Sequence, residues 1–216
     1  EATTNKIWKL KKCVYGLADA SRYWYLKVRE ELCKLGGKPS KLDQGIFYFY
    51  KGQELIGVVA LFVDDLLWAG NSTVAEIINK FKKIFHIGTE NHKSFIYIGI
   101  NLQQNDDKSI TIDQSTYTQS IQTIELTKEQ NADPHRKVTE KERSSIRKAL
   151  GQMNWLSNIS RPEISYQVSS ISSRIKEATI SDIKEINKLI KFVKENKGFI
   201  TFSSLHIPSI KIGMYS

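Results

Sequence analysis

The sequence contains few cysteines and histidines, the residues that form disulfides in small secreted domains or bind zinc. Only two cysteines, Cys13 and Cys33, and four histidines occur among 216 residues, and no CxxC motif is present. A disulfide scaffold and a zinc site are therefore disfavoured. The longest apolar run, 58–63, is much shorter than the ~20 residues that span a bilayer. Because no charged leader precedes an apolar segment, we expect neither secretion nor membrane insertion.

Acidic residues are also in the minority. Lysine and arginine number 32 against 23 aspartates and glutamates, which gives a net charge of +9. Hydrophobic residues make up 40% of the chain, enough for a folded core, so wholesale disorder is excluded. An excess of positive charge suits a polyanionic partner, with nucleic acid first and an anionic membrane surface second.

Hydrophobic periodicity predicts an α+β protein whose strands and helices are separated along the chain. Residues 1–125 are predicted to hold most of the strands, and residues 139–197 to be helical after a polar linker at 126–138. Strand-like residues return at 198–216. Two helices are predicted at 21–35 and 114–124. Four more are predicted to begin at a capping box of Thr73 and Glu76, at a second capping box of Thr139 and Glu142, at Pro162, and at a cap formed by Ser181 or Asp182. The predicted strands lie at 46–50, 54–62, 66–69, 94–103, 109–113, 199–203 and 208–212.

Two adjacent carboxylates, Asp64 and Asp65, interrupt an apolar run between two predicted strands. In a partly desolvated place the two charges would repel by roughly 4 kcal/mol at 4 Å, with an effective dielectric constant near 20. A divalent cation such as magnesium, which prefers oxygen ligands, would offset that repulsion. Alternatively, the pair is a solvated hairpin turn, as we expect for Asp106 and Asp107, whose neighbours are polar. This segment taken by itself favours the solvated turn.

The wider pattern resembles the copia type of retrotransposon reverse transcriptase. Phe62-Val63-Asp64-Asp65 is similar to the signature tetrad of that family. The further matching segments occur in the family's order, and they are Tyr15-Gly16-Leu17, Trp24-Tyr25, Tyr97-Ile98-Gly99-Ile100, Gln114 with Tyr117, and Ser160-Arg161-Pro162-Glu163-Ile164.

The resemblance implies a partial polymerase palm, an antiparallel sheet with packed helices, in residues 1–125. It implies a helical thumb in residues 139–197 and the entry to a ribonuclease H connection in residues 198–216. The reaction would be RNA-directed DNA synthesis from deoxynucleoside triphosphates on an RNA or DNA template-primer, with two magnesium ions. The remaining partner would be the rest of the Pol polyprotein, including fingers and ribonuclease H. The location would be intracellular, in a cytoplasmic particle or the nucleus.

The same resemblance implies roles for single residues. Asp64 and Asp65 would be the catalytic metal ligands. Phe62 and Val63 would lie under the primer terminus and the incoming nucleotide, and Tyr15 and Gly16 would line the nucleotide pocket. The candidate contacts with the nucleic-acid backbone are Lys9, Lys11, Lys12, Arg143, Arg147, Lys184, Lys188 and Lys191. These basic residues have a plainer explanation, since charged side chains also keep strand and helix surfaces soluble.

Three departures from the family pattern set the expectation for activity. No aspartate-bearing strand precedes Tyr15, so the third catalytic carboxylate of the family has no counterpart. Asp19 stands in a segment, 18–21, that the family usually fills with lysine, glutamine, alanine and proline. The sequence also stops before the acidic residues of ribonuclease H. We therefore expect little or no polymerisation by these 216 residues alone. The alternatives are a basic nucleic-acid-binding remnant of a transposon and an unrelated two-metal nuclease.

Overall fold

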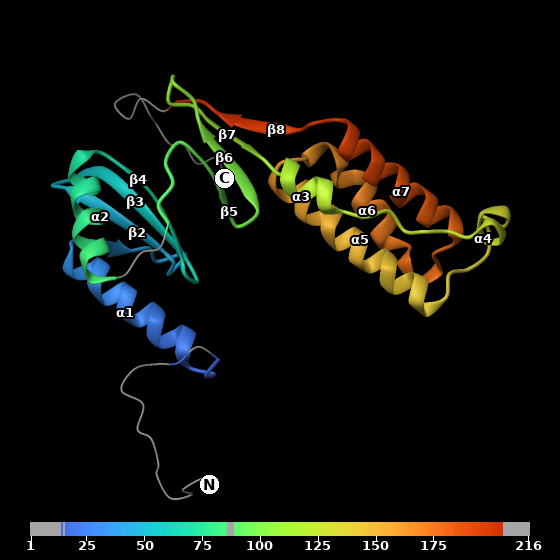
Figure 1. Cartoon of the computed structure of the whole chain (residues 1–216), viewed down its shortest axis with the longest axis horizontal. Coiled ribbons are helices and arrows are strands. Elements are labelled where there is room, and N and C mark those ends of the chain that lie inside the picture. Colours follow the sequence, from blue (N-terminus) through green and yellow to red (C-terminus); the bar gives the residue numbers. More distant parts are fainter. Residues whose placement is uncertain (1–13, 15, 86–88, 205–216) are drawn as a thin grey trace, which may run out of the picture. The chain divides into compact units, whose positions relative to one another are not determined.

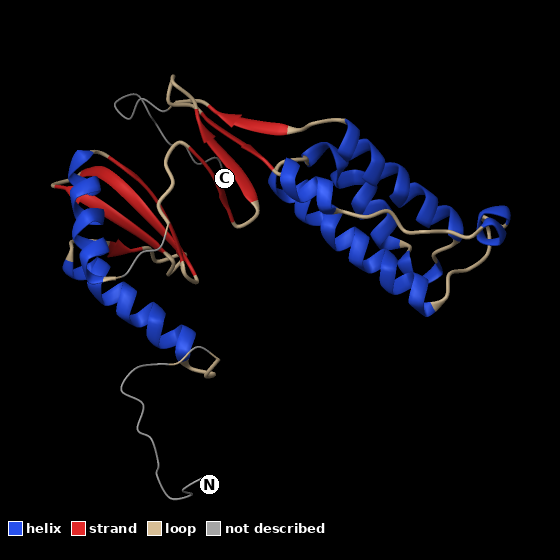
Figure 2. Cartoon of the chain, viewed as in Figure 1, coloured by secondary structure: helices blue, strands red, loops and turns tan. Residues whose placement is uncertain are grey.

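The computed structural model describes residues 14, 16–85 and 89–204, and they form two compact units. The first unit ends at Glu90 and the second begins at Asn91. Each unit contains one antiparallel four-stranded sheet with its own helices (Figures 1 and 2). The predicted α+β class is thereby confirmed.

The sheet of the first unit follows the chain order β1-β2-β3-β4. Its strands are β1 (Lys38–Pro39), β2 (Ile46–Lys51), β3 (Glu54–Phe62) and β4 (Asp65–Gly70), and its helices are α1 (Ala20–Lys34) and α2 (Ser72–Ile84). β2, β3 and β4 are joined by short turns, so each strand pairs with the next one along the chain. The strands predicted at 46–50, 54–62 and 66–69 are confirmed.

Both helices of the first unit pack on one face of its sheet. The core contains Val28 and Leu32 from α1, Phe47 from β2 and Val59 from β3, all fully buried, together with Ile78 from α2. The opposite sheet face carries no helix in the described part of this unit. It includes Ile46, Tyr48, Val58, Ala60 and Leu67, all half-buried.

The second unit combines a sheet with a helical bundle. Its elements are β5 (Ser94–Tyr97), β6 (Ile100–Gln104), β7 (Ile110–Asp113), α3 (Ser115–Ser120), α4 (Lys128–Ala132), α5 (Glu140–Ile159), η1 (Pro162–Ile164), α6 (Ser165–Ser173), η2 (Ile175–Glu177), α7 (Ile180–Glu195) and β8 (Phe199–Phe202). The sheet order is β5-β6-β7-β8, so the last strand pairs with β7 across some 90 residues of sequence. The core lies between α5, α6 and α7 and includes Ile146, Met153, Leu156, Ile171 and Ile186.

Several predicted elements differ from the structure. The single strand predicted at 94–103 is a hairpin, because the chain turns at Ile98 and Gly99, both with positive φ. The linker predicted at 126–138 contains α4, which begins at a capping box formed by Thr127 and Gln130. The strand predicted at 208–212 lies outside the described residues.

Helix caps were predicted with mixed success. The Thr139–Glu142 capping box is confirmed. The predicted Thr73–Glu76 box is wrong, because α2 begins earlier and the Asn71 side chain accepts hydrogen bonds from the N–H groups of Thr73 and Val74. For α7 the cap is Thr179, and Asp182 closes its box from the third helical position. Asp19 occupies the N-cap position of α1, but its side chain makes no capping hydrogen bond.

The compact units meet at residues 90 and 91, whereas the palm was predicted to extend to about residue 125. β5, β6 and β7 are grouped with the helices because β8, which follows the bundle, pairs with β7. The assignment of palm and thumb roles to these segments stays a prediction.

Candidate active site at the β3–β4 turn

The paired aspartates lie at the turn between β3 and β4. Val63 and Asp64 form the turn itself, and Asp65 is the first residue of β4, paired with Phe62 at the end of β3. Val63 has φ 53, a left-handed conformation that glycine usually supplies in such turns and that strains a β-branched residue. The predicted position of both carboxylates at the tip of a hairpin is confirmed.

Strand pairing fixes the sheet face on which Asp65 lies. Because Asp65 pairs with Phe62 and side chains alternate along strands, both residues share the face of Ala60 and Leu67, opposite the helices. Phe62 and Val63 are exposed, at 50% and 60%. The carboxylate of β4 therefore borders an apolar surface that α1 and α2 leave open.

A tryptophan from α1 holds the turn in place. The indole Nε1–H of Trp24 donates to the Val63 carbonyl at 2.9 Å, across 39 residues of sequence. The Trp24 ring packs edge-on against Phe85, with ring centroids 5.2 Å apart. The next residue, Tyr25, donates its hydroxyl to the Gln44 carbonyl at 3.1 Å. Two consecutive side chains of one helix thus fix the turn and a neighbouring loop.

The loop before β2 approaches the end of β3 closely. Gly45 accepts a hydrogen bond from the Leu61 N–H at 2.8 Å, and its own N–H donates to the Asp43 carboxylate. A Cβ added at Gly45 would lie 2.7 Å from the Leu61 carbonyl oxygen, so only glycine fits this approach. The backbone at the end of β3, which leads into the acidic turn, is therefore restrained.

Asp64 and Asp65 are both exposed, and neither pairs with a cation or donor among the described residues. The partly desolvated environment considered from the sequence is therefore wrong, and the solvated-turn interpretation describes the site as it stands. Water screens the mutual repulsion, so the fold itself does not require a metal here. The carboxylate oxygens remain available as ligands.

The other adjacent pair, Asp106 and Asp107, lies in a turn in which one carboxylate is hydrogen-bonded. Asp107 accepts hydrogen bonds from the hydroxyl and the N–H of Ser109, and these bonds lower the pKa of Asp107. The Asp107 side chain therefore stabilises the β6–β7 turn. The two acidic turns therefore differ, because Asp64 and Asp65 make no such local bonds.

The remaining predicted site residues are only partly visible. Gly16 is described, has φ 96 and is exposed, with open space where a Cβ would lie. Tyr15, Lys9, Lys11 and Lys12 lie outside the described residues. The nucleotide pocket predicted from Tyr15 and Gly16 therefore stays a prediction.

The two predicted arginine contacts on α5 are engaged within the protein. Both Arg143 and Arg147 pair with Glu140, and Arg143 also donates to the Lys176 carbonyl. The Nε of Arg143 is buried without a partner in the described part of the chain. The single carboxylate of Glu140 thus balances one of the two positive charges at these positions.

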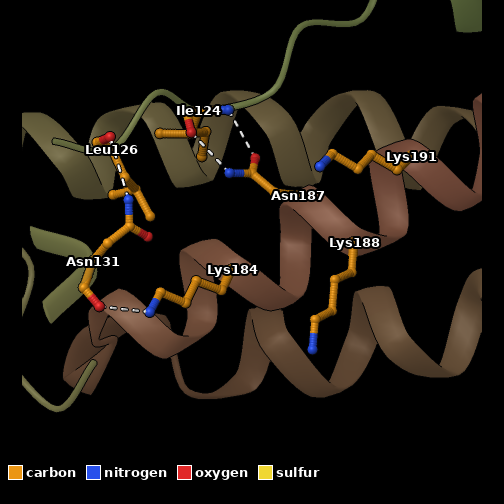
Figure 3. A pocket seen from close by; sticks show the side chains of 7 residues that line it. All are labelled: Ile124, Leu126, Asn131, Lys184, Asn187, Lys188 and Lys191. Carbon is orange, nitrogen blue, oxygen red and sulfur yellow. Dashed lines mark hydrogen bonds between the residues drawn. The ribbon is translucent and has the colours of Figure 1, made fainter. Parts of the chain in front are cut away.

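The three predicted lysines of α7 gather around a pocket of about 280 Å³ in the second unit (Figure 3). Lys184 donates to the Asn131 carbonyl at 2.9 Å. Lys188 and Lys191 form no ion pair or hydrogen bond with other described residues. All three lysines belong to α7, while the pocket and its wall at 124–131 gave no signal in the sequence.

The donor chemistry of the β3–β4 turn fits a hard divalent cation in part. Carboxylate oxygens are the ligands that magnesium prefers, and two are exposed here. Within the described ranges no group of three or more histidine, cysteine, aspartate or glutamate side chains forms a metal site. The turn therefore presents two exposed carboxylates, and their role as metal ligands stays a prediction. Sequence reasoning gave Trp24 as part of a segment that matches the family, but it missed the role of Trp24 as the anchor of this turn.

The site is thus an exposed acidic pair on a β-hairpin, beside a sheet face that the described helices leave open. Residues 1–135 match the family model described as reverse transcriptase (RNA-dependent DNA polymerase). The chain belongs to this family. The resemblance inferred from the ordered motifs is thereby confirmed.

Curated relatives agree with the family match. The chain is 25% identical over 209 residues to the putative transposon Ty5-1 protein YCL074W of Saccharomyces cerevisiae, covering 89% of the chain and 66% of that protein. It is 24% identical to the retrovirus-related Pol polyproteins from transposons RE2 and RE1 of Arabidopsis thaliana, covering 86% and 88% of the chain. The matches span only 13% and 14% of those polyproteins. No solved structure matches.

None of the helices within the described ranges has both the length and the apolar character needed to cross a membrane.

Proposed function

We propose that the β3–β4 turn is the metal-binding part of a nucleotidyl-transfer site, in which Asp64 and Asp65 hold magnesium while DNA is synthesised on an RNA or DNA template. The observation that carries this proposal is the acidic pair itself. It is exposed, it is free of local partners in the described chain, and it is fixed on a restrained turn. The family membership supplies the reaction.

The residues around the turn have distinct tasks. Asp64 and Asp65 supply oxygen ligands, and magnesium bound there neutralises charge on the transferred phosphates. Phe62 and Val63 offer an exposed apolar surface on which the primer end rests. Trp24 keeps the Val63 carbonyl, and with it the turn, in one position. Positioning and charge neutralisation account for most of the catalysis of phosphoryl transfer.

The unpaired edge of β4 supports a metal site to which another strand also contributes a ligand. In the described chain β4 pairs only with β3, so the backbone groups along its other edge have no strand partner. Such an edge is a ready template for another strand. An aspartate-bearing strand, of the kind that the family resemblance implies, would pair beside Asp65 and bring the third carboxylate to the same end of the sheet.

Metal binding by the turn is the first test. We expect the 216-residue protein to bind Mn²⁺ weakly, as measured by paramagnetic line broadening, and Asp64→Asn/Asp65→Asn to abolish that binding. The matched control is Asp106→Asn/Asp107→Asn, which removes the same charge from a turn whose aspartate is already hydrogen-bonded. Equal Mn²⁺ binding by the wild type and the Asp64→Asn/Asp65→Asn variant would contradict the proposal.

Primer extension on an RNA template is the second test. We expect no extension by residues 1–216 alone, because two carboxylates are one fewer than the resemblance implies. DNA synthesis by this chain alone would refute that expectation.

A binding module is the second candidate function, and the uncompensated lysines of α7 favour it. It predicts salt-sensitive nucleic-acid binding that Asp64→Asn leaves unchanged and no transfer chemistry in any assembly that contains this chain. Degradation of the primer would instead indicate a nuclease.

A further inference from the structure

We propose that Arg161 forms a joint that fixes the orientation of the helical bundle relative to the sheet β5-β6-β7-β8 within the second unit. Two neighbouring strands connect the sheet to the bundle, because β7 leads into α3 and β8 follows α7 (Figure 1). Asp113 at the end of β7 pairs with Phe199 at the start of β8, so both connections leave the sheet at the same place. Paired strands twist readily, so the angle of the bundle depends on further contacts at this place.

The side chain of Arg161 lies in the interior beside the second of these connections. Arg161 follows the end of α5 and is only 3% exposed. Its Nη1–H donates to the Val193 carbonyl at 3.0 Å, and its Nε–H donates to the Glu163 carboxylate. The Val193 carbonyl is one of the last four of α7, which have no acceptor role within the helix. A positive donor at this end also suits the helix dipole, so Arg161 holds the end of α7 against the end of α5.

The chain between α7 and β8 passes directly against the same guanidinium group. A Cβ added at Gly198 would lie 2.2 Å from the Arg161 Cδ and 2.3 Å from its Nε. Gly198 does not have a positive φ, so the close approach, and not the backbone conformation, requires glycine here. Because Arg161 is buried and bonded to Val193, it cannot move aside without losing that bond. Arg161 therefore determines where the chain enters β8.

The preceding residue, Ser160, contacts the other connection. The Ser160 hydroxyl donates to the Gln114 Oε1 at 2.8 Å, and both side chains are buried. Gln114 stands between the end of β7 and the start of α3. Two consecutive residues after α5 thus contact the two connections separately, Ser160 at β7–α3 and Arg161 at α7–β8. This arrangement gives the segment 160–161 a mechanical role that goes beyond the proposed function and does not depend on it.

The test measures the distance between a spin label on the sheet and one on the bundle by pulsed electron paramagnetic resonance. The labels are attached at Gln103→Cys on β6 and Lys148→Cys on α5, both exposed positions, after Cys13 and Cys33 are replaced by serine. Arg161→Met keeps an unbranched side chain but removes the donors. We expect it to broaden the distance distribution and shift its mean. The amides of residues 199–202 should exchange roughly tenfold faster, as expected for the loss of a hydrogen bond from a charged group.

The matched control is Arg174→Met, which removes another arginine of the bundle. Arg174 donates to Ser170, Asp182 and Glu185, which all lie on α6 or α7. This variant should lower the stability of the bundle and leave the label distance unchanged. Gly198→Ala tests the joint from the opposite side, because the added methyl group displaces the guanidinium while its charge is retained. We expect the same broadening as for Arg161→Met.

An unchanged distance distribution in either folded variant of the joint, or equal broadening by Arg174→Met, would overturn the proposal, since Arg161 would then only add stability. If Arg161→Met lacks the circular dichroism of the helices, Gly198→Ala decides the question, because it keeps the native residue 161. The result is separable from that of the proposed function. Arg161→Met should leave Mn²⁺ binding at the β3–β4 turn unchanged, and Asp64→Asn/Asp65→Asn should leave the label distance unchanged.

Discussion

The hydrogen bond from Trp24 to the Val63 carbonyl links α1 to the β3–β4 turn, in which Val63 has a strained, left-handed backbone conformation. Trp24→Phe keeps an aromatic ring against Phe85 but removes the N–H donor. We expect this change to lower the free energy of unfolding of the first unit by about 1 kcal/mol, the usual net contribution of one hydrogen bond. Amide exchange at residues 62–65 should accelerate, and Mn²⁺ affinity should fall, because the acidic turn loses its anchor.

Tyr25→Phe is the matched control for this prediction. It removes the neighbouring side-chain bond to the Gln44 carbonyl and leaves the Val63 carbonyl untouched. A comparable loss of stability with unchanged exchange at residues 62–65 would support the specific role of Trp24. If both variants alter the turn equally, the anchor assigned to Trp24 is wrong.

At the scale of the helix, the first turn of α5 depends on one glutamate. Glu142 accepts hydrogen bonds from the N–H and hydroxyl of Thr139, from Gln130, and from Arg136 at 2.6 Å. Partial burial by itself raises the pKa of Glu142, but the bonds from Arg136 and Thr139 outweigh it and lower the pKa to about 2 from 4.5. A proton therefore binds this carboxylate more weakly in the folded chain than in the unfolded one.

The lowered pKa gives the pH dependence its sign. Stabilisation by ionised Glu142 is fully present above about pH 4.5 and is lost as the pH falls towards 2. Glu142→Gln should destabilise the second unit by roughly 1.5–3 kcal/mol at pH 7, in the range for hydrogen bonds to a charged group. The difference from the wild type should shrink as urea denaturation is repeated from pH 5 to pH 2.

The control for the glutamate is an exposed ion pair. Glu177 pairs with Lys137, and both side chains are largely open to solvent. Glu177→Gln should have no measurable effect at pH 7, since exposed pairs contribute little. A difference between Glu142→Gln and the wild type that stays constant down to pH 2 would contradict the electrostatic explanation.

The sequence predicted elements best where local signals agreed with the tertiary fold. The β3–β4 turn is marked by polar residues between apolar runs and the start of α5 by a capping-box pattern, and both are confirmed. The β5–β6 turn was missed because Ile98 and Gly99 interrupt an apolar stretch without a polar turn residue. At α2 the cap is Asn71, which can accept the same kind of hydrogen bond as the predicted Thr73 and stands two residues earlier.

The position of the candidate site and its solvated turn were predictable, but the uncovered sheet face beside it was not. Sequence alternation located Asp64 and Asp65 on a hairpin. It could not show that the sheet face beside them carries no helix, because that depends on the face against which α1 and α2 pack. The pocket wall was also hidden, since Asn187 and Ile124 are 63 residues apart and meet only in the folded bundle.

At the scale of the whole molecule, the family match and the compact units divide the chain differently. The match covers residues 1–135 and so continues past the boundary at residues 90 and 91 into the second unit. The two cores share no residue, since one is built from α1, α2 and the first sheet and the other from residues 121–193. Because the two cores are packed separately, we expect the two units to have independent stability.

Matched core substitutions test that independence. Leu32 in α1 and Leu156 in α5 are both fully buried leucines on helices, one in each core. Each leucine-to-alanine change should destabilise its own unit by roughly 2–5 kcal/mol. In calorimetry we expect two unfolding transitions, with Leu32→Ala lowering one midpoint and Leu156→Ala the other. A single transition that both variants shift would show that the units unfold together, because cooperative coupling would then transmit a cavity in one core to the stability of the other.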